Sequence, residues 1–231
     1  MKKYLLHALL CTFLILILTG CSKPKAKSQS TTSISESTTS TTTSSTDPHS
    51  VYAAVLSSAM GPITYYNQND ARWYDHLYGK QDVLSIYGCG PTTLASLVSS
   101  FFDPQMTPDK MADWAYENGY WASKNGSYHT IISEGLSSLG FQVKGLSTPS
   151  KETITSSLKS GHILVALMGK GHFTEEGHFI LILDVDNDGT LHIADVNSYE
   201  NTKKTWKIST ILNELKTSAT AGGPVWEISL P

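Results

Sequence analysis

The chain has 231 residues and a formal net charge of −3, and this length predicts one domain of roughly 100–200 residues with appendages. An acidic balance with a single arginine, Arg72, argues against a nucleic-acid partner, because arginine makes the bidentate contacts to phosphate and guanine. Three cysteines, Cys11, Cys21 and Cys89, exclude a disulfide-dense scaffold and a four-thiolate zinc site.

The chain begins like a bacterial lipoprotein precursor. Two lysines precede an apolar run over residues 5–18, which is shorter than the ~20 residues of a transmembrane helix and is typical of a signal peptide. The run ends in LTGC, which resembles the lipobox, whose cysteine is lipidated on sulfur and becomes the first residue. We therefore predict a signal peptide over 1–20 and a lipid anchor on Cys21, on the extracytoplasmic face of a bacterial cell membrane. The alternative is an ordinary signal peptide with an accidental cysteine.

A Ser/Thr-rich stretch follows the predicted anchor. From 28 to 46, 16 of 19 residues are Ser or Thr, and such a composition buries too little apolar surface to offset the entropy of ordering. We interpret residues 21–50 as a flexible tether, open to O-glycosylation. The folded domain is predicted over 51–231, which is long enough for one core without disulfides.

The remaining cysteine lies where a helix is predicted to start. After Gly88-Cys89-Gly90-Pro91, apolar residues recur with helical spacing at Leu94, Leu97, Val98 and Phe101. A thiol at a helix N-terminus meets free N–H groups and the positive end of the helix dipole, which favour the thiolate. The flanking glycines allow a sharp turn and close approach to the sulfur. We predict that Cys89 is a nucleophile; the alternative is a buried structural cysteine.

The remaining pattern predicts an α+β fold, because helices gather in the first half and strands in the second. Helices are expected at 90–102, 108–118, 128–139, 151–159 and 210–216. Strands are expected at 141–146, 163–168, 179–184, 190–196, 205–208 and 225–229. The cysteine would then lie on a helical half and pack against an antiparallel sheet.

A thiolate nucleophile needs a base, and the tripeptide Gly-His-Phe occurs twice, around His172 and His178. Only His178 leads into a strand-like stretch, and a strand holds a base more rigidly than a glycine-rich loop does. We therefore predict His178 as the base and His172 as a residue of a loop at the rim. Histidines as zinc ligands are less favoured, because no short His-x-x-x-His spacing links them.

The base needs an orienting group, and the second strand of a predicted hairpin supplies two. A two-residue turn around Asp188 pairs the strands so that His178, Asp195 and Asn197 share one face. An odd-length loop or a bulge would change this register. The same turn also resembles part of a calcium loop, with acids at 184, 186, 188 and 195; a plain hairpin is favoured, since both flanks are strand-like.

At this point the chain resembles the bacteriocin-processing (double-glycine) peptidase-like family of papain-like cysteine peptidases. The resemblance covers about residues 63–226 and rests on four motifs in order: Gln68-x-Asp70-x-x-Trp73, Gly88-Cys89-Gly90-Pro91-Thr92, Phe173-Thr174-x-x-Gly177-His178-Phe179 and Ala194-Asp195-x-Asn197-Ser198. It implies a papain-like fold in which Cys89 is the nucleophile, His178 the base and acid, and Asp195 the orienting residue. It also implies that Gln68 donates to the oxyanion.

Two departures from the family are visible. Members usually carry Asp-Pro at the orienting position, whereas Val196 follows Asp195 here, so Asn197 is kept as a reserve. The residues around the papain cysteine itself are absent, so the chain is not a close papain relative.

The predicted function is a surface-anchored thiol hydrolase, a cysteine peptidase or amidase that cleaves a peptide or a cell-wall peptide cross-bridge. Leader trimming after Gly-Gly fits poorly, because that reaction belongs to the cytoplasmic side of an export transporter. The alternative is an inactive peptidase-fold lipoprotein that binds peptide or cell-wall glycan through the aromatic residues between Tyr65 and Tyr128. We expect no cofactor, no metal, no nucleic acid and a monomer.

Overall fold

The computed structural model describes residues 50–146 and 148–231. The predicted signal peptide, the anchor at Cys21 and nearly all of the predicted tether lie outside the described residues. Within the described ranges, no helix combines the length and the apolar character that crossing a membrane requires.

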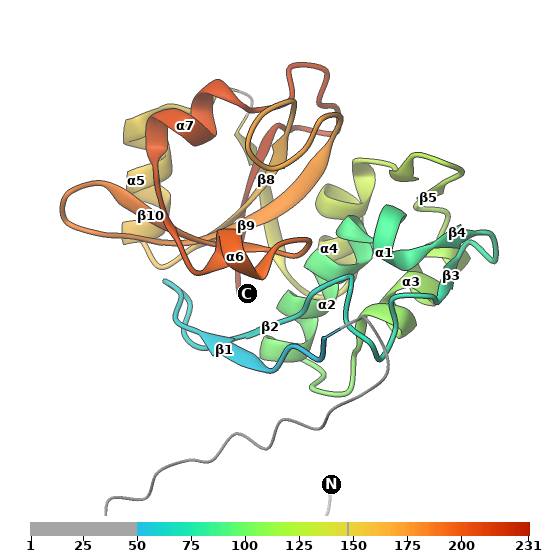
Figure 1. Ribbon diagram of the computed structural model, residues 1–231. Helices are drawn as coiled ribbons and strands as arrows, with labels where there is room; N and C mark the ends of the chain where they lie inside the picture. Colours follow the sequence, from blue (N-terminus) through green and yellow to red (C-terminus); the bar gives the residue numbers. More distant parts are fainter. Residues whose placement is uncertain (1–49, 147) are drawn as a thin grey trace, which may run out of the picture. The chain divides into compact units, whose positions relative to one another are not determined.

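The first half of the domain is mainly helical (Figure 1). Its helices are α1 (Leu84–Tyr87), α2 (Cys89–Phe101), α3 (Pro108–Glu117), the π-helix η1 (Ile131–Gly135) and α4 (Leu136–Ser138). Three two-stranded ribbons accompany them: β1 (Ala54–Leu56) with β2 (Ile63–Tyr65), β3 (Leu77–Tyr78) with β4 (Asp82–Val83), and β5 (Trp121–Ala122) with β6 (Gly126–Ser127).

The second half is built around a six-stranded antiparallel sheet in the order β11-β10-β9-β8-β12-β7. Its strands are β7 (Gln142–Leu146), β8 (Ile163–Met168), β9 (His178–Val185), β10 (Thr190–Asp195), β11 (Thr205–Lys207) and β12 (Val225–Ser229). Helices α5 (Lys151–Lys159), α6 (Tyr199–Thr202) and α7 (Ile208–Asn213) connect them.

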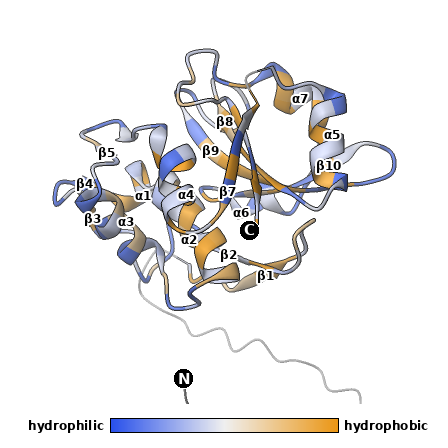
Figure 2. Ribbon diagram, turned by 180° about the vertical axis from the view of Figure 1, so that it is seen from behind, coloured by the Kyte–Doolittle hydropathy of each residue, from blue (hydrophilic) through white to orange (hydrophobic). Residues whose placement is uncertain are grey.

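The central strands β8 and β9 are buried on both faces, and their residues are mostly hydrophobic (Figure 2). Alternate residues of β9 point to opposite sides. Phe179, Leu181 and Leu183 join a core with the helical half, whereas Ile180 and Ile182 join a second core that includes residues of α5 and α7. The sheet therefore holds the helical half on one face and α5 and α7 on the other.

The α+β prediction is confirmed, and the main helices and strands lie close to their expected ranges. Helix α2 differs in one respect: it is buried nearly all round, including Thr92, Thr93 and Ser96, rather than on one apolar stripe. The reason is its position, because α2 packs against α3, β2 and β9 at once. The short ribbons and helices α1 and α6 escaped prediction, since two to four residues carry too little periodicity.

The β9–β10 hairpin reaches the predicted register by an unexpected route. Near the turn, Val185 pairs with Leu191, so the loop is odd in length and neither two-residue turn forms. A register shift between His192 and Ile193 restores the pairing expected for a turn at 187–188, and Asp195 lies opposite Ile180. His178 and Asp195 thus share a face because the two irregularities cancel.

Candidate active site

Cys89 is the first residue of α2, as predicted. The flanking glycines are required by packing rather than by a sharp turn, since Gly88 has an ordinary φ of −92°. A Cβ at Gly88 would lie 2.4 Å from the carbonyl oxygen of Leu84, and one at Gly90 would lie 2.5 Å from Ser127 Oγ. Both glycines therefore let the start of α2 sit tightly between α1 and β6.

His178 is the first residue of β9 and is 4% exposed. Its Nε2 lies 2.7 Å from Oδ1 of Asp195, which ends β10 and is 1% exposed. A buried carboxylate hydrogen-bonded to one ring nitrogen fixes the orientation of the imidazole and leaves Nδ1 as the nitrogen available to another group.

That other group is the thiol of Cys89, because Cys89 and His178 each shift the pKa of the other. Burial alone would raise the pKa of Cys89, but His178 and the backbone N–H groups of Phe179 and Gly90 bring it below its ordinary value. Burial lowers the pKa of His178, yet Asp195 and Cys89 outweigh this and raise it to about 9. The electrostatics favour a thiolate beside an imidazolium.

The carboxylate of Asp195 is held on every side. Oδ1 accepts the backbone N–H groups of Asn197 (2.9 Å) and Ser198 (3.2 Å), and Oδ2 accepts the side-chain amide of Asn201 at 2.9 Å. Burial would raise the pKa of Asp195, but His178 first, and then Asn201 and the Asn197 backbone, lower it. Sequence reasoning missed Asn201, because α6 is a four-residue helix without a periodic signal.

Gln68 is buried at 3% exposure, so it is not a solvated turn residue. Its Nε2 donates to the carbonyl oxygen of Ser85 at 2.6 Å, and its backbone N–H donates to Val196 O at 2.7 Å. The acceptor at Ser85 fixes which end of the amide is nitrogen, since two oxygens would repel at that distance. Gln68 is thus held between α1, which leads into Cys89, and the turn that follows Asp195.

The turns at 67–69 and 195–197 are also joined by side chains. Tyr65 donates its hydroxyl hydrogen to Asp195 O (2.8 Å), and Asn67 Nδ2 donates to that hydroxyl (2.8 Å). Asn69 Nδ2 donates to Asn197 Oδ1 at 2.8 Å. Asn197, the reserve orienting residue, therefore uses its side chain on Asn69, while Asp195 is the residue on His178.

The other histidines of the described residues with side-chain contacts to acids lie apart from this cluster. His172 contacts Glu214, His192 contacts Asp186 at 2.9 Å, His162 approaches Glu227 at 3.4 Å and His76 contacts Asp113 at 2.8 Å. No group of three or more acids, histidines or cysteines in the described ranges is arranged to hold a metal. The turn at 186–190 joins the two strands of a hairpin. Of the acids in the calcium-like pattern, Asp186 contacts His192 and Asp195 contacts His178.

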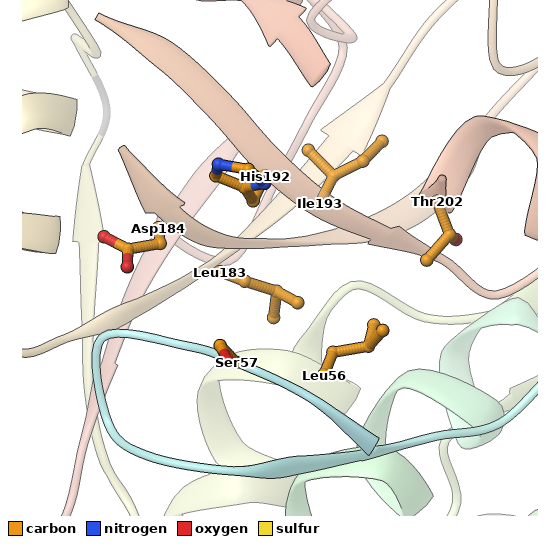
Figure 3. Close-up of a pocket in the computed structure, with 7 residues that line it drawn as sticks. All are labelled: Leu56, Ser57, Leu183, Asp184, His192, Ile193 and Thr202. Atoms are coloured by element: carbon orange, nitrogen blue, oxygen red, sulfur yellow. The ribbon is translucent and has the colours of Figure 1, made fainter. Parts of the chain in front are cut away.

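Two further features bear on ligand binding. The aromatic residues proposed to line a groove include Tyr65, Tyr66 and Trp73, which are at most 8% exposed and belong to the core. A small cavity of about 190 Å³ lies elsewhere, between the end of β1 and the β9–β10 hairpin, lined by Leu56, Ser57, Leu183, Asp184, His192, Ile193 and Thr202 (Figure 3). Neither feature includes Cys89 or His178.

The geometry can now be set beside known proteins. Residues 61–227, more than half of the chain, match the model of the Peptidase_C39-like family. The chain belongs to the Peptidase_C39-like family. A similar solved structure, described as a candidate C39-like peptidase from Bacillus anthracis, shares 14% identity and covers 63% of this chain and 90% of its own, with a TM-score of 0.43. Comparison with curated proteins gives no match.

Membership of this family supports a cysteine peptidase type of protein with a papain-like α+β arrangement. The family match spans all four sequence motifs, because the range from Gln68 to Ser198 lies wholly within the matched residues.

Proposed function

We propose that the protein is a cysteine peptidase or amidase in which Cys89 is the nucleophile, His178 the proton carrier and Asp195 the residue that orients it. The single observation that carries the proposal is the line of interacting groups from the partly exposed Cys89 thiol to the buried His178–Asp195 pair. It supplies an activated nucleophile, a base and an orienting acid in one line.

In the proposed reaction, the Cys89 thiolate attacks the carbonyl carbon of the substrate amide, and the π electrons move onto the oxygen. The His178 imidazolium then gives its proton to the leaving nitrogen as the C–N bond breaks, which leaves a thioester. A water molecule attacks this thioester and loses a proton to the now neutral His178. Collapse expels the thiolate, so the free carboxylic product leaves and the ion pair is restored.

The negative oxygen formed in each step needs donors. We assign this role to the side-chain amide of Gln68 and the backbone N–H of Cys89. One observation supports Gln68: its Nε2 gives one hydrogen to the carbonyl oxygen of Ser85, and the amide has a second N–H that can bond an oxyanion.

The proposed location is the outer face of the cell membrane, with a lipid on Cys21, and the proposed substrates are peptides or cell-wall peptide cross-bridges. The support is the sequence of residues 1–46, together with the fact that these amides surround a tethered domain there. The alternative, an inactive domain that binds peptide or glycan, predicts an unreactive Cys89.

The test uses the full chain, a fluorogenic peptide library and purified peptidoglycan. We expect hydrolysis that Cys89→Ala lowers by at least about 10³-fold, because the covalent route is lost. Cys89→Ser is the matched control for side-chain size, because serine is nearly as large as cysteine but has no thiol. Hydrolysis that survives in Cys89→Ala would overturn the assignment. An iodoacetamide reaction at pH 6 no faster than that of a model thiol would favour the binding alternative.

A further inference from the structure

The side chain of Asn201 has one contact that matters for the site. Its Nδ2 donates to Asp195 Oδ2 at 2.9 Å, which is the oxygen that His178 does not use. Its backbone groups are engaged separately, since Asn201 N donates to Ser198 Oγ at 3.2 Å and Asn201 O accepts from Trp206 Nε1 at 3.0 Å. The backbone contacts hold the residue in place, and the side-chain amide is directed at the carboxylate.

Trp206, on β11, also contacts the loop that precedes His178 in the chain. Its ring lies 4.5 Å from that of Phe173 and 5.6 Å from that of His172, measured between centroids. Both rings belong to the loop at 169–177 that runs directly into His178. The same indole therefore contacts the loop before His178 and, through its N–H, the residue that bonds Asp195.

We propose that Asn201 is a positioning residue for the Asp195–His178 pair, and that Trp206 holds Asn201 in that role. The inference rests on the proposed function, and it adds a residue that the family motifs do not contain. Oδ1 of Asp195 is held by His178 and by two backbone N–H groups, and Asn201 is the side-chain donor on Oδ2. This donor fixes the second oxygen in place and favours the charged form, which in turn stabilises the imidazolium beside Cys89.

Titratable groups in contact with Asp195 are few in the described residues. His178 meets Oδ1, and the Tyr65 hydroxyl donates to the backbone oxygen of Asp195 rather than to its carboxylate. Glu200 of α6 and Lys203, which directly follows that helix, pair with each other and are 73% and 50% exposed. Asn201 is thus the neutral side chain that donates directly to the carboxylate, and its loss should raise the pKa of Asp195.

The experiment measures the rate of Cys89 alkylation by iodoacetamide against pH, in the full chain without substrate. The variants are Asn201→Ala and Asn201→Leu, the second of which nearly keeps the shape of the side chain. We expect the midpoint for thiolate formation to move to higher pH, with alkylation at pH 6 slowed about three- to tenfold, in keeping with the loss of one charge-assisted hydrogen bond. Trp206→Phe keeps an aromatic ring but removes the indole N–H, and we expect a smaller shift of the midpoint in the same direction.

The controls separate this proposal from the one it rests on. Asn118→Ala removes an exposed amide that donates to a backbone carbonyl at the end of α3, and it should leave the midpoint unchanged. His178→Ala and Asp195→Ala should shift it more than Asn201→Ala does. If these two shift the midpoint and both Asn201 variants do not, even with a lower melting temperature, the positioning role is overturned and the proposed function stands. If wild type and His178→Ala share the midpoint of an ordinary thiol, the proposed function itself fails.

Discussion

The two Gly-His-Phe tripeptides of this chain have the same residues and different surroundings. His172 is 63% exposed by its side chain and pairs with Glu214 at the rim, whereas His178 is 5% exposed and pairs with Asp195. Each histidine has a carboxylate partner, but only His178 also contacts a thiol. The two histidines therefore differ in burial and in partners although their tripeptides are identical, and we propose only His178 as the proton carrier.

The different surroundings also explain why charge interactions are stronger at His178 than at His172. The side chains of His178 and Asp195 are at most 5% exposed, so the charges of Asp195, His178 and Cys89 act on one another with less screening than at the surface. In the other pair the His172 side chain is 63% exposed although Glu214 is only 13% exposed, so solvent screens this contact more than the one between His178 and Asp195. The structure thus contains its own control for the proposed site.

The largest effect should come from removing each histidine in turn. We expect His178→Ala to lower amide hydrolysis by at least about 10³-fold, because both the base and the acid are lost. His172→Ala should change it less than about threefold, since a rim residue carries no proton in the reaction. Steady-state kinetics on the most readily cleaved library peptide measures both. Equal losses would mean that the two tripeptides share the function.

A smaller effect should appear in the pH dependence, because the rates of hydrolysis and of Cys89 alkylation should differ at alkaline pH. The pKa of His178 is raised to about 9 by Asp195 and Cys89, so the imidazolium persists below that pH and is lost above it. Hydrolysis should therefore fall as the pH rises through about 9, because the leaving nitrogen loses its proton donor. Alkylation needs only the thiolate and should not fall there.

Both rates should decline on the acid side, since the pKa of Cys89 is lowered but protonation eventually removes the thiolate. Stopped-flow alkylation and kcat/KM measured over the same pH series provide the comparison. An alkaline decline shared by both rates would indicate local unfolding rather than titration of His178.

The smallest effect concerns stability at the rim. Glu214→Gln removes the charge that faces His172 while keeping the shape of the side chain, and we expect a loss of about 0–1 kcal/mol in the free energy of unfolding. Chemical denaturation at pH 7 measures it, and Lys203→Gln, which removes one charge from a pair with both side chains exposed, is the control. A loss well above that of the control would show that Glu214 supports the loop at 169–177 beyond its ion pair.

Much of the site could be predicted from local pattern. The glycines and proline around Cys89 indicate a helix start, and the strand after His178 and the alternation around Asp195 indicate a shared face. The register shows how far such reasoning reaches: the odd-length loop and the shift at His192 were each invisible in the sequence, and the expected face survived because they cancel. Gln68 could be suggested only by family resemblance, since its burial depends on contacts with Ser85 and Val196.

What the sequence determined by itself is the set of chemically capable residues and the elements that carry them, because helix starts and strand alternation are short-range properties of the chain. The tertiary structure decided which of them meet. It separated His178 from His172 by burial, gave Asp195 rather than Asn197 to the imidazole, and brought Asn201 to the second carboxylate oxygen. Those choices depend on contacts between residues far apart in the chain and on the exclusion of water, which no local pattern records.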